Sequence, residues 1–218
     1  NESNGEGFGE INSWDELSLS SDILRGIYAH GFEMPSPIQK KAIRPLMEKK
    51  DIIAQAQSGT GKTATFTIGA LANIDLSSNT TQVLVMSPTK ELTIQTGAVF
   101  KAISQFMPGL RIQLAYGGSV FEEGSSFSSR NVPHIICGCP GRVQDMMRRD
   151  KISAKKIKLV ILDEADEMLS AGFKDQMYNI FQNFGPDIQV ALFSATLPES
   201  LEGIIEKIMR DPVRISVK

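Results

Sequence analysis

The sequence has few cysteines and no long hydrophobic run. Its 218 residues include only two cysteines, Cys137 and Cys139, and the single residue between them gives poor geometry for a disulfide bond. A chain without disulfides fits a reducing compartment. No apolar stretch approaches the length that crosses a bilayer, and no signal-peptide pattern opens the chain. We therefore expect an intracellular protein with no membrane partner, cytoplasmic or, as the alternative, nuclear.

A strong excess of either charge is also absent. The formal net charge is -2, which excludes a global attraction to nucleic acid, so any such contact needs a local patch. With 41% hydrophobic and 22% charged residues, the composition is that of an ordinary globular protein of one domain or two small ones. His134 precedes Cys137 by three residues, which leaves a metal site open. A fourth ligand is missing, however, and a strand entering a loop is the alternative.

The most informative stretch of the sequence is 51–63, DIIAQAQSGTGKT. Its apolar start predicts a strand, and the loop that follows matches a phosphate-binding pattern at Ser58, Gly59, Thr60, Gly61, Lys62 and Thr63. In such a loop the glycines present backbone N–H groups inward, the lysine contacts the outer phosphates and the threonine hydroxyl can hold Mg²⁺. Ala56 stands where the pattern expects its first glycine. A flexible turn is the alternative, but the helix-like stretch that follows favours a nucleotide site.

Four further short apolar runs predict buried strands at 83–86, 135–137, 159–162 and 190–193. Helical periodicity appears at 19–28, from about residue 38, and at 98–106, 143–147 and 201–208. The alternation of strand and helix predicts an α/β fold with a parallel sheet covered on both faces, whose ligands bind beyond the carboxyl ends of the strands. Residues 1–13 are polar and glycine-rich, so we expect a flexible tail there and one folded domain over 14–218.

Two carboxylates, Asp163 and Glu164, follow the strand expected at 159–162. A carboxylate at a strand end fits a Mg²⁺ ligand, and an adjacent glutamate can accept a proton from an attacking water. An acidic helix start is the alternative, because carboxylates favour the first turn of a helix. Together with the loop that ends at Thr63, the pair indicates both halves of a nucleotide hydrolysis site.

Three motifs together resemble the first RecA-like lobe of the DEAD-box RNA helicases: AQSGTGKT at 56–63, DEAD at 163–166 and SAT at 194–196. The resemblance covers about 14–218, and an alanine at position 56 is ordinary in that family. It implies a RecA-like P-loop NTPase domain that uses ATP with Mg²⁺ and couples RNA-stimulated ATP hydrolysis to local unwinding of RNA duplexes. The residues it implies for catalysis are Lys62, Asp163, Glu164, Asp166, Ser194 and Thr196, with Thr63 and Asp163 as Mg²⁺ ligands.

Within this resemblance the SAT motif has a further role. Ser194 and Thr196 would bond Asp166 and link hydrolysis to the opening and closing of two lobes. TLPE at 196–199 is also a capping-box pattern, and both interpretations can hold.

The stretch GFEMPSPIQ at 31–39 resembles the adenine-binding Q motif of the family. The resemblance implies that Gln39 bonds the adenine edge and that Phe32 stacks on its face, with Pro37 in the same pocket, which favours ATP over GTP. Trp14 stands where relatives often place a phenylalanine. Anchoring the first helix in the core is the alternative role for this tryptophan.

Three further motifs lie where a loop enters a helix or turns sharply, and such places offer backbone N–H groups to phosphates. By resemblance they bind the backbone of single-stranded RNA, largely independently of base sequence, through Pro88, Thr89, Lys90, Gly117, Gly118, Cys139, Gly141 and Arg142. Lys90 keeps the charge of the family's usual arginine without its planar fork, and Cys139 is a weaker donor than the usual threonine. The basic residues at 148–158 fit an RNA patch or a solvated helix end, and we assign them no role.

The chain begins at Asn1 and nothing in it corresponds to the family's second RecA-like lobe, so we expect a piece of a longer protein that is nearly inactive alone. FKDQMYNIF at 173–181 and MRDPVRISVK at 209–218 are most similar to the branch of eukaryotic translation initiation factor 4A, with the exon-junction branch close behind. The resemblance implies a HEAT-repeat scaffold of the factor 4G type as a partner. An ATP-gated RNA clamp of the exon-junction type is the alternative function. A nucleotide kinase or GTPase is disfavoured, because neither DEAD nor the Q-like stretch has a role there.

Overall fold

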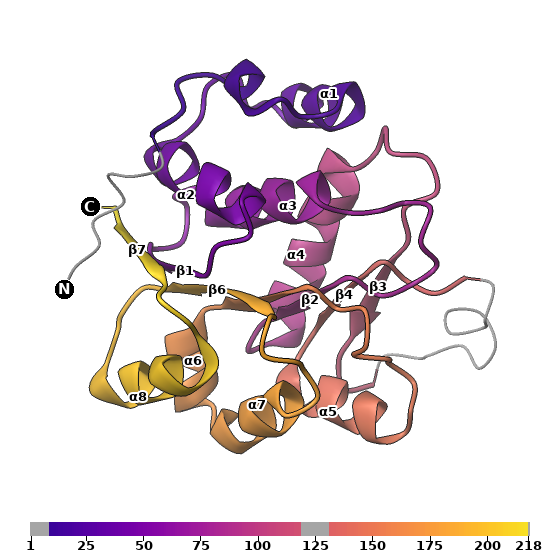
Figure 1. Ribbon diagram of the computed structural model, residues 1–218, viewed down its shortest axis with the longest axis vertical. Helices are drawn as coiled ribbons and strands as arrows, with labels where there is room; N and C mark the ends of the chain where they lie inside the picture. Colours follow the sequence, from indigo (N-terminus) through magenta and orange to yellow (C-terminus); the bar gives the residue numbers. More distant parts are fainter. Residues whose placement is uncertain (1–8, 119–130, 218) are drawn as a thin grey trace.

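A parallel sheet runs through the middle of the domain (Figure 1). The computed structural model describes residues 9–118 and 131–217, and within them seven strands are hydrogen-bonded in the order β3-β4-β2-β5-β6-β1-β7. All of the neighbouring strand pairs are parallel. The strands are β1 (Ile52–Gln55), β2 (Val83–Met86), β3 (Ile112–Ala115), β4 (Ile135–Gly138), β5 (Leu159–Asp163), β6 (Gln189–Ser194) and β7 (Val213–Ser216).

Helices cover both faces of this sheet (Figure 1). One layer holds α1 (Ser21–Ala29), α2 (Pro37–Met47), α3 (Lys62–Ala72) and α4 (Lys90–Ile103). The other layer holds α5 (Pro140–Arg148), α6 (Ala165–Ser170), α7 (Lys174–Phe181) and α8 (Glu199–Ile208). Among the described residues, no helix is long and apolar enough to span a membrane. The predicted α/β fold with a doubly covered parallel sheet is confirmed.

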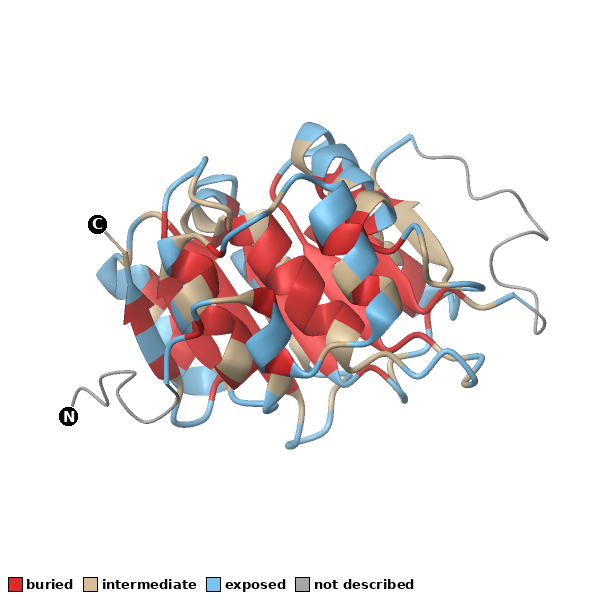
Figure 2. Ribbon diagram, turned by 90° about the horizontal axis from the view of Figure 1, so that it is seen from above, coloured by how far each residue is buried: buried red, intermediate tan, exposed pale blue. Residues whose placement is uncertain are grey.

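Successive strand residues face the two helix layers in turn. Ile52 and Ala54 belong to the hydrophobic cluster that includes residues of α1 to α4, whereas Ile53 belongs to the cluster that includes residues of α5 to α8. Figure 2 shows the buried residues gathered on the central strands and the inner sides of the helices. Because both faces are covered, the central strands need an apolar residue at nearly every position. They are therefore visible in the sequence as unbroken apolar runs.

The structure extends the predicted elements and adds others. The four strands expected after the phosphate loop are present as β2, β4, β5 and β6, with ends within one residue of the predicted ones. The edge strands β3 and β7 were not predicted, because β3 is mostly half-buried and β7 alternates between buried and exposed residues. The helix expected at 98–106 is wrong at both ends, since α4 spans Lys90–Ile103 with Thr89 as its N-cap.

The amino-terminal boundary also differs from the expectation. Ile11 is buried, and its N–H donates to Lys40 O at 3.1 Å. A short 3-10 helix follows at Trp14–Leu17. Ile11 is thus one packed residue within the expected tail and produces no periodic pattern. Residues 1–8 lie outside the described residues, so the flexible tail stays a prediction.

Gly26 sets the distance between α1 and α4. A Cβ atom at this position would lie 1.7 Å from the backbone oxygen of Ile103. We expect Gly26→Ala to lower the free energy of unfolding by about 3 kcal/mol, because the helices must separate to admit the methyl group. Urea unfolding followed by circular dichroism measures this change.

Gly203→Ala is the matched control for this substitution. Gly203 lies inside α8, and a Cβ there meets no atom within 4 Å. Alanine at position 203 should therefore stabilise the protein by up to about 1 kcal/mol through helix propensity. Equal effects of the two substitutions would show that α1 and α4 are not in close contact at Gly26.

His134 should make the stability depend on pH. The side chain is buried, and its Nδ1 accepts a hydrogen bond from Arg111 N at 3.1 Å. Burial, with the Arg111 charge second, lowers the pKa of His134. The unfolded chain therefore binds more protons, and the free energy of unfolding should fall as pH falls below about 6.5, the pKa of an unperturbed histidine.

Two substitutions separate this effect from other titrations. In urea unfolding, His134→Gln should remove part of the fall in stability below about pH 6.5, because the unfolded chain then has no histidine at this position to protonate. His30→Gln is the control, because His30 is exposed and is the other of the two histidines. An unchanged pH profile in His134→Gln would contradict the assignment.

Candidate active site

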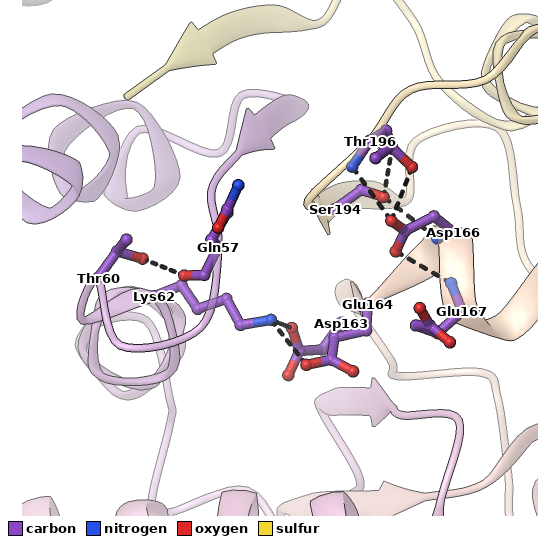
Figure 3. A network of polar contacts seen from close by, with 9 residues as sticks. All are labelled: Gln57, Thr60, Lys62, Asp163, Glu164, Asp166, Glu167, Ser194 and Thr196. Carbon is purple, nitrogen blue, oxygen red and sulfur yellow. Dashed lines mark hydrogen bonds and ion pairs between the residues drawn. The ribbon is translucent and has the colours of Figure 1, made fainter. Parts of the chain in front are cut away.

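The loop between β1 and α3 is turned by two glycines in the left-handed region. Gly59 has a φ of 81° and Gly61 a φ of 87°, and this region costs other residues about 1 kcal/mol or more. Thr60 Oγ1 donates to Gln57 O at 2.6 Å and closes the turn (Figure 3). The helix α3 begins at Lys62 directly after the loop. Backbone N–H groups at such a helix start form a site for phosphate.

The Q-like stretch lies against this loop. Ser36 Oγ donates to Thr60 O at 3.0 Å, and Gln39 Nε2 donates to Gly61 O at 3.3 Å. Gln39 is buried, and its Oε1 accepts from Ser36 N at 2.7 Å where Pro37 begins α2. The structure therefore brings Pro37 and Gln39 to the phosphate loop, and both polar atoms of the Gln39 side chain bind the chain itself.

Two rings line a cavity of about 280 Å³ beside the loop. The ring centroids of His30 and Phe32 are 4.9 Å apart, and Lys62 lines the same cavity. Trp14 is fully buried in the core, as expected if it anchors the first helix there. Its Nε1 also donates to Phe32 O at 3.1 Å. The tryptophan thus fixes the backbone of a residue that lines the cavity.

Lys62 joins the loop to the end of β5. Its Nζ lies 3.0 Å from Asp163 Oδ1 and 3.2 Å from Glu164 Oε1 (Figure 3). The Asp163 side chain is 2% exposed, and burial raises its pKa although the charge of Lys62 opposes the shift. Glu164 adopts a left-handed backbone, with φ 53° and ψ 53°, which is uncommon outside glycine. This turn places the Glu164 carboxylate beside Lys62.

The donors at this place fit a magnesium ion. Asp163 Oδ1 is buried with Lys62 Nζ at 3.0 Å, and a carboxylate has further lone pairs that can bind a cation. Thr63, in the first turn of α3, supplies a hydroxyl oxygen next to Lys62. Mg²⁺ prefers oxygen ligands and needs only one or two from the protein when phosphates and water supply the rest. A cluster of three metal-ligating side chains, which the described residues lack, is not required for it.

Asp166 is held by the segment that follows β6. Its Oδ2 accepts from Thr196 N at 3.1 Å and from Thr196 Oγ1 at 2.8 Å (Figure 3). Ser194 Oγ accepts from Asp166 N at 3.1 Å and donates to Thr196 O at 2.7 Å. Burial opposes the shift, but hydrogen bonds from Thr196 and Ser194 outweigh it and lower the pKa of Asp166. The expected contact between the DEAD and SAT motifs is present.

A second cavity, of about 530 Å³, extends from Lys62 to another set of loops. It shares Ser58, Lys62 and Glu164 with the smaller cavity and reaches Pro88 and Thr89 at the start of α4. One hollow region therefore connects the phosphate loop with a motif expected to bind RNA.

The three motifs expected to bind RNA follow three adjacent strands. β3, β4 and β2 are neighbours, and their last residues, Ala115, Gly138 and Met86, are in register. The motifs begin directly beyond this edge, with Gly117, Gly118, Thr89 and Gly141 exposed and Lys90 in the first turn of α4. The structure thus brings most of the predicted residues to one surface, as backbone contact with a single RNA strand requires, whereas Pro88 is buried.

Two contacts between these motifs were not predicted from the sequence. Thr93 Oγ1 lies 3.5 Å from Cys139 Sγ, and the same hydroxyl also donates to Thr89 O at 3.0 Å within α4 and its cap. Lys90 Nζ lies 5.2 Å from the ring centroid of Tyr116. The spacing of four residues between Thr89 and Thr93 could have indicated the bond between those two threonines, but no local pattern indicates the contact with Cys139.

The basic residues at 148–158 do not form one surface. Arg148 and Arg149, at the end of α5, pair with Asp145. Lys158 instead donates from Nζ to Asn73 O, at the carboxyl end of α3, and sits just before β5 begins. Arg148 and Arg149 thus pair on α5, in one helix layer, whereas Lys158 bonds the end of α3, in the other layer.

A phosphate loop after β1 and a buried carboxylate at the end of β5 define the class of P-loop nucleotide hydrolases. The chain also matches the family model of the DEAD/DEAH box helicases over residues 36–204, and it belongs to that family.

Individual relatives agree with this assignment. The chain is 46% identical over 208 residues to the ATP-dependent RNA helicase eIF4A of Schizosaccharomyces pombe, covering 95% of this chain and 53% of that protein. A DEAD box protein from Methanococcus jannaschii superposes with a TM-score of 0.89 at 34% identity, over 96% of this chain and 57% of that one. Saccharomyces cerevisiae Dbp5, solved bound to RNA and ADP BeF3, gives 0.86 at 36% identity, over 95% and 52%. The chain spans about half the length of the relatives it matches.

Gly61 should resist substitution more than Gly59. Both have positive φ, but a Cβ at Gly61 would lie 2.8 Å from Gln39 Nε2 and 2.9 Å from Ser36 Oγ, whereas a Cβ at Gly59 meets nothing within 4 Å. We expect Gly61→Ala to release the Q-like stretch and to lower the free energy of unfolding by about 1 kcal/mol more than Gly59→Ala does. Urea unfolding of the nucleotide-free protein measures the difference.

Amide hydrogen exchange gives the local readout for this pair of variants. Faster exchange at residues 36–39 in Gly61→Ala alone is the expected result. If Gly59→Ala destabilised the protein as much, the cost would come from backbone strain and not from contact with Gln39 and Ser36.

Proposed function

We propose that this chain is the ATP-binding lobe of an ATP-dependent RNA helicase. The observation that supports the proposal most is the arrangement at one edge of the sheet. A phosphate loop held by the Q-like stretch lies there beside a pair of carboxylates, and a hollow lined by Lys62 and Glu164 reaches Pro88 and Thr89, the first of the motifs suited to an RNA backbone. Membership of the helicase family supports the same conclusion.

ATP would enter between the rings near Phe32 and the loop 58–63. Lys62 then exchanges its two carboxylate partners for the outer phosphates, because both partners compete for the same ammonium group. Thr63 and Asp163 are the residues that would hold Mg²⁺, which neutralises charge on the phosphates when bound. Phe32 and Gln39 would recognise adenine by stacking and by the remaining hydrogen-bonding capacity of the amide.

Glu164 is the proposed general base. Its carboxylate bonds Lys62, and it would orient and deprotonate a water once Lys62 turns to the phosphates. Asp166 is fixed to Ser194 and Thr196, so the position of the DEAD motif depends on the segment after β6. That coupling is the proposed route by which hydrolysis changes lobe closure.

RNA would bind along the ends of β3, β4 and β2. The exposed backbone at Thr89, Gly117, Gly118 and Gly141 supplies N–H groups, with Lys90 and Arg142 adding positive charge. Such contacts ignore base identity and favour single strands.

The whole protein would contain a second RecA-like lobe that completes the ATP site and the RNA clamp. The 46% identity to an eIF4A supports a cytoplasmic role in translation initiation, more than an exon-junction clamp, and a HEAT-repeat scaffold of the factor 4G type as partner. ATP-driven closure of the two lobes on RNA would separate short duplexes locally.

The chain joined to a second RecA-like lobe should hydrolyse ATP, and single-stranded RNA should stimulate it. The 218-residue chain alone should turn over ATP at least about 10³-fold more slowly, because the arginines that complete such sites come from the other lobe. A phosphate-release assay with and without RNA measures both. Equal turnover by the lobe alone, indifferent to RNA, would overturn the split-site proposal.

Glu164→Gln in the joined protein tests the assigned base. Turnover should fall by about 10²–10⁴-fold while ATP binding persists, because the amide keeps the shape but accepts no proton. Glu206→Gln, an exposed position in α8, is the control and should hydrolyse ATP like the wild type. Normal turnover by Glu164→Gln would assign the base elsewhere.

A further inference from the structure

Asp145 is bound by three arginines, two in its own helix α5 and one, Arg149, at the C-cap of that helix. Its Oδ2 accepts from Arg142 Nη1 at 3.1 Å. On the other side, Oδ1 accepts from Arg149 Nε at 3.1 Å and lies 3.5 Å from Arg148 Nη2. The two carboxylate oxygens are thus divided between one arginine near the start of α5 and two at its end.

The position of Arg142 requires such a partner. It lies in the first turn of α5, where the helix dipole disfavours a positive charge. Arg148 and Arg149 lie at the opposite end, where the dipole favours them, and their side chains are 72% and 69% exposed. Arg142 is only 27% exposed and lies directly after Gly141, within the motif expected to bind RNA. The two exposed arginines therefore hold one oxygen of Asp145 and leave the other directed at Arg142.

We propose that Asp145 is a positioning residue for RNA binding: it holds the guanidinium of Arg142 at the edge of the sheet, ready to bind a phosphate. The inference rests on the proposed function, since it needs RNA along β3, β4 and β2. A guanidinium has five N–H donors, so Arg142 can keep its bond to Asp145 while others face a phosphate. A preoriented arginine loses less side-chain freedom when it binds.

The proposal predicts that removing Asp145 changes the RNA affinity in the direction opposite to that expected from its charge alone. Asp145 is a negative charge near a polyanion, so its removal should by charge alone strengthen RNA binding. If Asp145 positions Arg142, its removal should weaken binding instead. An asparagine at 145 cannot accept from both sides, because one of its two polar atoms is an NH₂ group.

The test measures the affinity of a fluorescent oligouridylate by anisotropy, for the chain joined to a second RecA-like lobe, with an ATP analogue and over a range of salt. Asp145→Asn should weaken binding by about three- to tenfold, and the slope of log K against log salt should decrease by up to about 0.7, the value for one phosphate contact on a single strand. A structural role alone would change the melting temperature without changing this slope.

Asp150→Asn is the matched control for charge. Asp150 is exposed, follows the end of α5 and has a left-handed φ of 56°, which asparagine tolerates. Its removal should leave affinity unchanged or raise it slightly. Stronger binding by Asp145→Asn, or a change equal to that of Asp150→Asn, would overturn the positioning role.

A double-mutant cycle with Arg142→Lys identifies the route of the effect. Lysine keeps the charge but not the fork, so Asp145→Asn should have little further effect in that background. A full additional loss there would show that Asp145 does not act through Arg142. If the wild type itself failed to bind the oligouridylate, the proposed RNA function would fall, and this distinguishes that failure from a failure of the Asp145 proposal alone.

Discussion

The buried ion pair between Lys62 and Asp163 connects the phosphate loop to the end of β5, and the site is arranged around it. The two side chains are 8% and 2% exposed, so both charges are largely shielded from bulk water. Removing one member of a buried pair typically costs about 3–5 kcal/mol, because the remaining charge is left uncompensated. Glu164, turned into the left-handed region, gives Lys62 a second carboxylate at 3.2 Å. Nucleotide binding in the proposed reaction therefore exchanges one set of charge contacts for another.

The order of the strands places the two proposed activities side by side. β2 lies between β4 and β5, so the loop after β2 is next to the other loops proposed to bind RNA on one side and the DEAD motif on the other. Thr93 contacts both Thr89 and Cys139, and Asp166 contacts the segment after β6. Side-chain hydrogen bonds thus join α4 to the loop after β4, and the DEAD motif to the segment after β6. A parallel sheet makes this possible, because all of its strand-to-helix loops leave from one edge.

Strands buried on both faces and helices with a regular apolar face could be predicted from the sequence. Edge strands and the ends of helices could not. β2, β4, β5 and β6 form unbroken apolar runs, whereas the edge strands β3 and β7 bury only part of their surface and give weaker patterns. The start of α4 at Lys90 is fixed by the Thr89 cap, a local signal that periodicity does not include. Ile11 is held by the core and by Lys40, contacts that no local pattern indicates.

The sequence by itself determined the fold class and the chemistry of the site. Gly59, Gly61 and Lys62 in their order specify a phosphate loop, since only local backbone geometry and one charge are needed. Only the tertiary structure decided which distant groups meet: Gln39 on Gly61, Trp14 on Phe32, and Asp145 between three arginines. The physical reason is that a residue's type fixes what it can bind, whereas its partner depends on how helices and strands pack, and packing is a property of the whole chain.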